Sequence, residues 1–309
     1  MRLHAKVLLV VIPLSVIPLL LLGWLAYEQL RSTGVERSSD QMTTLMDQLA
    51  QNFHVRTEVA EANVKLFADA SLMRSYALTE DEEARYALML PSLLKLFASY
   101  LRAYPDYYEI RFLLPDGFED VRATLTPIPN ATVEEGDTFF FKALSRSEDE
   151  TLSRVFTNPD NGEIALQAAR PLYLIDIAND DPLGTGPRLR GYLVITMKLD
   201  SIAEQIAENH IGKRGHILVT DKKGKILFHH DPSQVGETLP ATLMKTAWNT
   251  STEKQPHRAS YQGEPALLAS QALHKNLLLM GVLPASELLE ESWRLGKTVA
   301  WIILGTVTL

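Results

Sequence analysis

The sequence predicts an α+β fold in which a long N-terminal helix leads into two stacked lobes, each an antiparallel sheet with flanking helices, between two membrane-spanning helices. Three observations support this prediction. Residues 7–26 carry no charge, and residues 299–309 are apolar again. The spacing of apolar residues changes at Pro105 from a helical period to alternation, and a turn-linked pair of strands then occurs twice along the chain.

The uncharged run of twenty residues at positions 7–26 follows Arg2 and Lys6. At about 1.5 Å per residue, a helix of this length crosses the roughly 30 Å hydrocarbon core of a bilayer. A cleavable signal peptide is the alternative, but its apolar core usually has roughly 7–15 residues and ends at a small-residue cleavage site, which this run does not offer. We therefore predict a cytoplasmic N-terminus at residues 1–6 and a transmembrane helix at residues 7–26.

Residues 299–309 cover only about half of a bilayer at helical rise, so we expect them to begin a second transmembrane helix that continues past this sequence. A short tail packed on a soluble core is the alternative. The segment between two spans lies on one side of the membrane, and the basic residues before the first span favour the outside. We expect the inner (plasma) membrane of a bacterium, with residues 28–298 in the periplasm.

Composition is typical of a folded region of about 270 residues between the two spans, which is enough for two domains. Charged residues make up 22% and hydrophobic residues 46% of the chain. The net charge of −8 argues against a nucleic-acid surface, which is usually basic. The absence of cysteine excludes disulfides and thiolate metal sites.

Residues 27–95 are predicted to form long stalk and packing helices. Between residues 30 and 76 there is no proline, and apolar residues recur at spacings close to one helical face. Thr79 and Glu82 have the spacing of a capping box and indicate a new helix start. Residues 91–104 then predict another amphipathic helix, with a proline in its first turn.

Strands are predicted where alternating segments are bounded by turn residues. They fall at residues 107–114, 118–125, 163–174 and 191–198 in a first lobe, and at residues 215–220, 225–230, 257–262, 265–273 and 277–283 in a second. Helices are predicted from Ser201 and over residues 239–248. The resulting division is a membrane-distal lobe at residues 96–200, a membrane-proximal lobe at residues 201–284 and an exit helix at residues 285–298.

Short motifs accompany these elements in a fixed order. They are Tyr104-Pro-Asp-Tyr-Tyr-Glu-Ile-Arg111 before Pro115-Asp-Gly117, Ala169-Arg-Pro171, Gly191-Tyr-Leu-Val-Ile-Thr-Met197, Gly212 to Gly215, Val219-Thr-Asp221, Gly224-Lys-Ile-Leu-Phe-His-His-Asp-Pro232 and Val235-Gly236. Their order and spacing resemble the double Cache sensor domain of bacterial transmembrane receptors, built from two PAS-like lobes, over residues 27–294. The resemblance implies a small-molecule pocket in the distal lobe, between the sheet and a covering loop.

One subfamily with this fold binds amino acids through an Arg-x-Trp-Tyr-x-x-Ala motif in the covering loop and an Asp before the connecting helix. The comparable segment here, Asp137-Thr-Phe-Phe-Phe-Lys-Ala143, retains only the alanine. Asp137 replaces the carboxylate-binding arginine, Phe139 and Phe140 replace Trp and Tyr, and Thr196 falls at the position of the Asp. A ligand carboxylate facing Asp137 would be repelled, so the amino-acid assignment does not carry over.

Strand alternation selects further pocket candidates. It places Tyr107, Glu109, Arg111 and Leu113 on the pocket face, and Tyr108, Ile110, Phe112 and Leu114 on the face toward the helices. Pairing of Glu109 and Arg111 with each other or with their neighbours is the alternative, and Phe139, Phe140 and Phe141 favour a core role. The candidate ligand-binding residues are Arg111, Asp137, Phe139, Phe140, Gln167 and Thr196. The opposite charges of Arg111 and Asp137 suggest a ligand with both a cationic and an anionic part, or a polar one.

A metal site is not expected. His229, His230 and Asp231 are ligand types that suit zinc or copper, with His216, His257 and His274 elsewhere in the chain. Adjacent strand residues point to opposite faces, however, so His229 and His230 are not expected to share one ion.

The predicted function is the ligand-sensing module of a transmembrane signal receptor. Binding in the distal lobe would pass a conformational signal through the second membrane helix to a cytoplasmic output domain, with a histidine kinase or diguanylate cyclase expected and a chemotaxis signalling rod as a further option. We expect no cofactor, a small-molecule ligand of unknown class, a homodimer and no nucleic-acid partner. None of the short catalytic signatures is present, so no catalysis is expected. A membrane-anchored periplasmic hydrolase or a partner-binding scaffold is the alternative, since paired carboxylates have no short signature.

Overall fold

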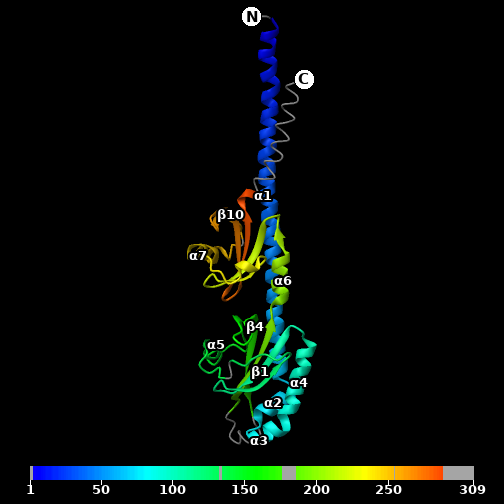
Figure 1. Cartoon of the computed structure of the whole chain (residues 1–309), viewed down its shortest axis with the longest axis vertical. Helices are drawn as coiled ribbons and strands as arrows, with labels where there is room; N and C mark the ends of the chain where they lie inside the picture. The colour runs from blue at the N-terminus through cyan, green and yellow to red at the C-terminus, as the bar shows by residue number, and fades with distance from the viewer. Residues whose placement is uncertain (1–2, 132–133, 176–185, 254, 288–309) are drawn as a thin grey trace. The chain divides into compact units, whose positions relative to one another are not determined.

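A computed structural model describes four stretches of the chain, residues 3–131, 134–175, 186–253 and 255–287 (Figure 1). The chain divides into two compact units. The β1–β5 unit comprises Gln51–Ala203, and the β6–β11 unit comprises Met1–Ala50 together with Glu204–Leu309. Each unit contains one antiparallel sheet. The predicted α+β class, with a long N-terminal helix and two antiparallel sheets, is therefore confirmed.

Helix α1 runs from Leu3 to Ala68 and contributes to both units. Within the described stretches, no helix combines the length and the apolar character that a membrane crossing requires. The predicted span at residues 299–309 and the predicted exit helix beyond residue 287 lie outside the described residues.

The helical segment before the first sheet is more interrupted than predicted. Helix α1 ends at Ala68, and the next helices are α2 (Ser71–Leu78), α3 (Glu82–Ala84), a π-helical turn η1 (Arg85–Met89) and α4 (Leu90–Ala103). The capping box predicted from Thr79 is wrong. The Asp81 carboxylate instead accepts the N–H groups of Glu83 and Ala84 at 3.0 and 3.3 Å. The Thr79 hydroxyl turns back and donates to the Ser75 carbonyl at 2.8 Å, at the end of α2.

The β1–β5 unit holds a five-stranded antiparallel sheet in the order β2-β1-β5-β4-β3. Its strands are β1 (Tyr107–Leu113), β2 (Glu119–Thr124), β3 (Leu152–Thr157), β4 (Ile164–Leu174) and β5 (Arg188–Lys198). Helices α2 and α4 pack on one face, where the ring of Tyr76 meets that of Phe112 edge-on. The short helix α5 (Phe139–Leu144) covers the opposite face with Phe140 and Phe141 (Figure 1).

A β-bulge between Tyr107 and Glu109 changes the predicted alternation of β1. Tyr107 was assigned to the pocket face, but its hydroxyl accepts a hydrogen bond from Asn63 of α1 at 2.7 Å, and its ring contacts Phe67. The hydroxyl of Tyr108, which is predicted on the helix face, instead accepts a hydrogen bond from the side-chain amide of Asn158 at 2.8 Å. The bulge therefore exchanges the sheet faces of Tyr107 and Tyr108, while Glu109 and Arg111 stay on the predicted face.

Helix α6 (Asp200–Glu208) follows β5, and the chain passes within it from the β1–β5 unit to the β6–β11 unit, at Glu204. The sheet of the β6–β11 unit has the order β6-β7-β11-β10-β9, with β8 paired to β7. The strands are β6 (His210–Ile211), β7 (Gly215–Asp221), β8 (Ile226–His229), β9 (His257–Tyr261), β10 (Glu264–His274) and β11 (Leu277–Pro284), and β8 is followed by the turn η2 (Pro232–Gln234).

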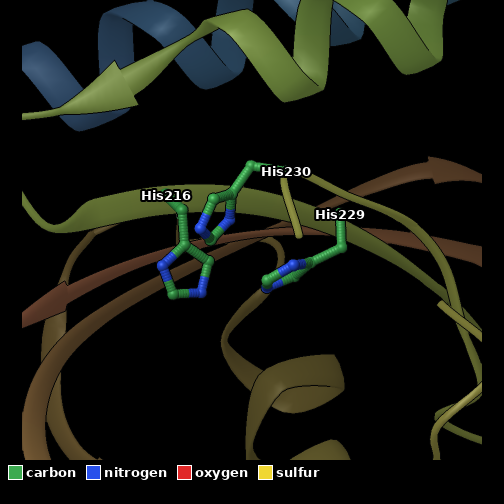
Figure 2. A group of neighbouring side chains, drawn as sticks. All are labelled: His216, His229 and His230. Atoms are coloured by element: carbon green, nitrogen blue, oxygen red, sulfur yellow. The ribbon is translucent and has the colours of Figure 1, made fainter. Parts of the chain in front are cut away.

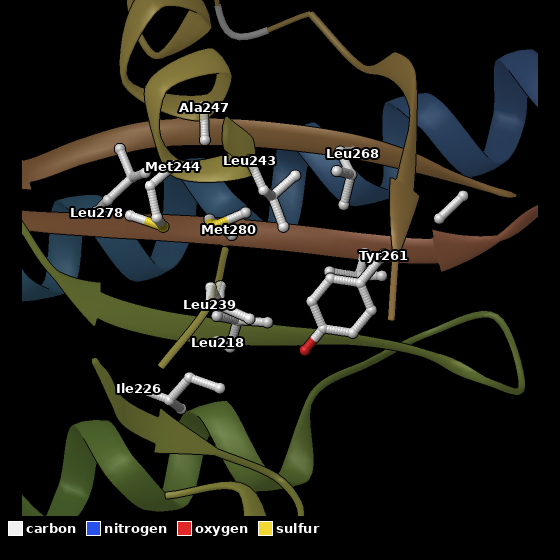
Figure 3. Packing of buried hydrophobic residues seen from close by; sticks show 12 residues of the cluster. Leu218, Ile226, Leu239, Leu243, Met244, Ala247, Tyr261, Leu268, Leu278 and Met280 are labelled. Atoms are coloured by element: carbon white, nitrogen blue, oxygen red, sulfur yellow. The ribbon is translucent and has the colours of Figure 1, made fainter. Parts of the chain in front are cut away.

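Two helices cover the two faces of this second sheet. Helix α7 (Ala241–Thr250) packs Leu243, Met244 and Ala247 against Leu268 and Met280, forming the hydrophobic core shown in Figure 3. On the other face, the buried side chains of Met42 and Met46 on α1 lie over Gly281, where an added Cβ would come within 2.8 Å of Met42. The glycine therefore allows the helix to approach the sheet closely.

Candidate functional site

The register of the first sheet places four polar residues side by side in one row. Arg154 on β3 pairs with Gln167 on β4, Gln167 with Thr196 on β5, and Thr196 with Glu109 on β1. Gln167 and Thr196 are fully buried, and Glu109 is 1% exposed. Because polar groups are rarely buried without a specific partner, this polar row, Arg154-Gln167-Thr196-Glu109, marks the candidate site.

Glu109 is the acidic end of the polar row and is bonded on both carboxylate oxygens. Its Oε1 accepts from Arg122 Nε at 2.7 Å, and its Oε2 accepts from the Thr196 hydroxyl at 3.1 Å. The same Oε2 lies 3.5 Å from Arg111 Nε. Arg122 also reaches Asp160 at 3.0 Å. Glu109 therefore compensates the buried Arg111 and the partly buried Arg122 at once.

Arg111 lies among three carboxylates. Its Nη1 is 2.8 Å from Glu135 Oε1 and 3.4 Å from Glu119 Oε2. Burial alone would lower the pKa of Arg111, but the charges of Glu109, Glu135 and Glu119 outweigh it and the pKa is raised. For the Glu119 carboxyl, burial raises the pKa, and the positive charge of Arg111 opposes that rise. Arg111 is therefore held in an internal ion-pair network.

Glu135 is positioned by the start of α5. The Thr138 hydroxyl caps this helix by accepting the Phe141 N–H at 3.1 Å, and it donates to Glu135 Oε2 at 3.1 Å. One threonine thus fixes both the helix and the carboxylate that faces Arg111.

Arg154 differs from the other arginines of the cluster. Its Nε donates to Gln167 Oε1 at 2.8 Å, and its guanidinium lies 3.9 Å from the ring centre of Phe140 and 4.2 Å from that of Phe156. It forms no ion pair with a carboxylate of the described residues. Burial lowers the pKa of Arg154 to about 10, against the opposing charge of Glu135, so the side chain remains a cation at neutral pH.

The sequence-predicted site residues divide into two groups. Arg111, Gln167 and Thr196 lie in the polar row or its ion-pair network, and Phe140 stacks on Arg154. Asp137 does not join them, because it is exposed and pairs with Lys142 at 3.0 Å. Phe139 does not join them either, since it is 90% exposed.

Sequence reasoning missed Arg154, Arg122, Glu119, Glu135 and Asp160 as parts of the cluster. Arg122 is the register partner of Arg111 on β2, so alternation along the hairpin was the signal that could have found it. Arg154 had no such signal because its strand was not predicted.

A surface depression of about 440 Å³ lies beside the β1–β2 turn, lined by Asp116, Gly117, Phe118, Glu134, Gly136 and Asp137. The polar row does not line it. Its open, acidic surface contains no basic group among these lining residues, so we take the buried polar row as the stronger candidate for a ligand site.

A second group of titratable side chains lies in the β6–β11 unit, where His216, His229 and His230 come together (Figure 2). The ring centres of His229 and His230 are 4.4 Å apart, so the expectation that these two rings diverge is wrong. Strand β8 ends at His229, and strict alternation does not extend to the next residue. Burial and the other two rings lower the pKa of His216 to about 4, which keeps its imidazole neutral.

The first sheet is antiparallel and has buried polar side chains beneath a short covering helix. Residues 27–292 match the family model described as the Cache domain, and the chain belongs to this family. The predicted resemblance is therefore confirmed. A Cache sensor domain is not itself catalytic.

Three solved structures show the same fold. The sensory domain of the Campylobacter jejuni chemoreceptor Tlp3 (CcmL) with isoleucine bound has a TM-score of 0.62 at 10% identity, covering 84% of this chain and 97% of that chain. The extracellular domain of the proposed histidine kinase vpHK1S-Z8 has a TM-score of 0.60 at 16% identity, covering 84% of this chain and 96% of that chain. A domain from Vibrio parahaemolyticus, assigned to the sensory box/GGDEF family, has a TM-score of 0.57 at 17% identity, covering 82% of this chain and 99% of that chain. No curated protein matches the sequence.

Proposed function

We propose that this chain is the sensor region of a bacterial transmembrane receptor and that its β1–β5 unit binds a small organic carboxylate at the polar row. Membership of the Cache family supports the sensor role. The observation that carries the ligand class is Arg154, a half-buried cation that lies over two aromatic rings and is not paired with any carboxylate of the described residues.

The argument for an anionic ligand rests on Arg154 and not on the summed charge, because the cluster holds four carboxylates (Glu109, Glu119, Glu135 and Asp160) and three arginines (Arg111, Arg122 and Arg154). Glu109, Glu119 and Glu135 all face Arg111, and Asp160 faces Arg122. These carboxylates pair with Arg111 and Arg122 and none of them pairs with Arg154, so a ligand at Arg154 meets a cation without an acidic partner. Arg154 presents a planar guanidinium that suits two-point contact with a carboxylate.

Gln167 supplies a second donor at the same place. Its Oε1 is used by Arg154, whereas its buried Nε2 has no hydrogen-bond partner among the described residues. An unmet buried donor typically costs about 1–3 kcal/mol, so an acceptor that satisfies it gains correspondingly. A carboxylate oxygen beside Arg154 would meet this need.

The surroundings of Arg154 also specify what the rest of the ligand is. Phe140 and Phe156 flank the guanidinium, and Leu113, Val194 and Tyr192 belong to the buried apolar cluster under α5. A carboxylate with an apolar body and no α-amine fits this environment. Ordinary α-amino acids do not, since their ammonium would have to be desolvated without a free acceptor.

Matched pairs of ligands test this proposal on the whole chain in detergent micelles. We expect isovalerate or 3-phenylpropanoate at millimolar concentration to raise the melting temperature, and valine and phenylalanine, which add only the amine, to leave it unchanged. Arg154→Gln should weaken binding of the stabilising carboxylate at least ~30-fold, because removing one partner of a buried charged pair costs about 2–5 kcal/mol.

The control for this experiment is Arg102→Gln, since Arg102 is an exposed arginine of α4 in the same unit. Arg102→Gln should retain the full ligand-induced rise in melting temperature. Equal shifts in Arg154→Gln and the parent would remove the polar row as the binding site. A shift with the amino acids and none with their amine-free counterparts would overturn the ligand class, and no shift with any compound would favour a partner-binding scaffold.

Membrane anchoring is the second part of the proposal. Residues 7–26 and the segment starting at residue 299 would cross the inner membrane and place residues 28–298 in the periplasm, supported by their apolar composition and the basic residues before the first span. A reporter that is active only in the periplasm should be active when fused at Gly186 or at Gln255. Activity of a cytoplasmic reporter at both positions would reverse the orientation.

The signalling step follows from this arrangement. We propose that the β1–β5 unit corresponds to the membrane-distal lobe, residues 96–200, and the β6–β11 unit to the proximal lobe, residues 201–284, with an exit helix at 285–298. The receptor would act as a homodimer with a histidine kinase or diguanylate cyclase as its output. A ligand can shift such a receptor only by its difference in affinity for two states, typically about 1–3 kcal/mol.

A further inference from the structure

Three histidines of the β6–β11 unit lie at one place although they come from two strands. His216 is the second residue of β7, His229 is the last residue of β8, and His230 follows it. The ring centre of His216 is 4.7 Å from those of both His229 and His230. Figure 2 shows the three side chains gathered with their rings close together. His216 and His229 are buried and His230 is partly buried.

The ring nitrogens of this cluster lack hydrogen bonds where they are buried. His216 Nε2, His229 Nε2 and His230 Nδ1 have no partner among the described residues. Each ring offers one nitrogen that lies within 4.8 Å of a nitrogen from each of the other two. A buried nitrogen without a partner typically costs about 1–3 kcal/mol, and three of them converging point to a common missing partner.

Backbone carbonyls lie next to the outer nitrogens of two rings. His216 Nδ1 is 3.5 Å from the Arg214 carbonyl, and His229 Nδ1 is 3.2 Å from the Asp231 carbonyl. A proton on Nδ1 would point to these carbonyls and leave Nε2 with a free lone pair, as in many metal-bound histidines. In its other tautomer His229 Nδ1 accepts the Asp231 N–H at 2.9 Å, so a bound metal would select the first tautomer.

We propose that His216, His229 and His230 form a three-histidine site for a divalent transition-metal ion of the zinc class. Imidazole nitrogens suit Zn²⁺, Cu²⁺ and Ni²⁺, whereas Ca²⁺ and Mg²⁺ take oxygen ligands. Nitrogens bound tetrahedrally to Zn²⁺ at about 2.0–2.1 Å are roughly 3.3 Å apart, so the rings must close by about 1.5 Å at most, within reach of side-chain rotation. Water would fill the fourth position.

The surroundings are compatible with a bound ion. The Tyr261 ring lies 5.6 Å from that of His216, and its buried hydroxyl has no hydrogen-bond partner among the described residues. A metal-bound water is a suitable partner for such a hydroxyl. This site would tie the end of β8 to the start of β7, and it is separate from the polar row because it lies wholly in the β6–β11 unit.

Metal binding is measured on the whole chain, purified without a histidine tag and stripped with a chelator. We expect one Zn²⁺ per chain by calorimetry, visible absorption bands of four-coordinate Co²⁺, and a melting temperature that rises with Zn²⁺. His230→Asn and His229→Ala should each weaken Zn²⁺ binding at least ~100-fold and remove the cobalt bands, since even outer-shell changes cost 10–100-fold. The fold should tolerate His230→Asn better than His229→Ala, because His230 is only partly buried.

The matched control is His54→Ala, which removes a histidine whose side chain is 62% exposed on α1. It should bind Zn²⁺ as the parent does. Circular dichroism of each variant without metal shows whether it is folded, so that loss of binding is not confused with unfolding. Binding at less than one ion per chain, or equal affinity in the parent and in folded His230→Asn, would overturn the proposed site.

Discussion

Replacing Glu109 with alanine is expected to destabilise the β1–β5 unit by about 3 kcal/mol, the lower end of the cost of breaking a buried ion pair, because Arg111 and the partly buried Arg122 lose the carboxylate that they share. Thr196 would also lose its hydrogen-bond acceptor. The measurement is the denaturant midpoint of the transition that reports this unit. Glu109→Gln keeps the acceptor for Thr196 but removes the charge, and it should fall between alanine and the parent.

The control for this prediction is Asp137→Ala. Asp137 is also a carboxylate paired with a cation, but its pair with Lys142 is exposed, and such pairs contribute little. Its midpoint should match that of the parent. If Glu109→Ala unfolds at the parent's denaturant concentration, the buried arginines do not depend on Glu109, and the ion-pair network would have to be reassigned.

The second large effect is expected at Gly117, in the turn between β1 and β2. Its φ of +93° is one that residues with a side chain rarely adopt, and an added Cβ would lie 2.5 Å from the backbone nitrogen of Gly136. The Gly117 carbonyl also accepts the Glu135 N–H at 3.0 Å, so this turn helps to place Glu135 against Arg111. Gly117→Ala should cost about 3–5 kcal/mol, the sum of backbone strain and overpacking.

Gly162→Ala separates the cost of backbone strain from the cost of overpacking. Gly162 has a similar φ of +76°, but nothing lies within 4 Å of an added Cβ, so only the strain of about 1–2 kcal/mol remains. Urea midpoints of the two variants, compared with the parent, give the difference. Equal losses at Gly117 and Gly162 would mean that the turn can move away from Gly136 and that the close approach is not required.

The sheets were predictable from the sequence where alternation and turn chemistry agreed. The hairpin around Pro115-Asp-Gly117 and strands β7 to β11 were predicted within one or two residues of their bounds, whereas the two-residue strand β6 was not predicted. Strand β3 was missed because most of its residues are half-buried and Ser153 and Arg154 interrupt its apolar pattern. Helix α5 was missed because six residues are too few to show a helical period.

The candidate site was predictable only where it depended on local pattern. Alternation along β4 located Gln167, and the position of the family's Asp located Thr196; the register then brings both next to Glu109. Asp137 was chosen by its position in a motif, and nothing in that position indicates that the side chain points to solvent. The pairing of Arg111 with Glu135 joins residues far apart in the sequence, which no local pattern encodes.

The division of the chain into units bears on the order in which they fold during synthesis. The β1–β5 unit is one continuous segment, whereas the β6–β11 unit combines the N-terminal part of α1 with residues that are synthesised after the β1–β5 unit. The first can be completed on the ribosome before β11 exists. Met42 and Met46, whose final contacts are with Gly281, have no sheet to cover until then. The side chains of Met42 and Met46 are therefore uncovered until β11 has been synthesised, which opens this part of α1 to chaperone binding or misassociation.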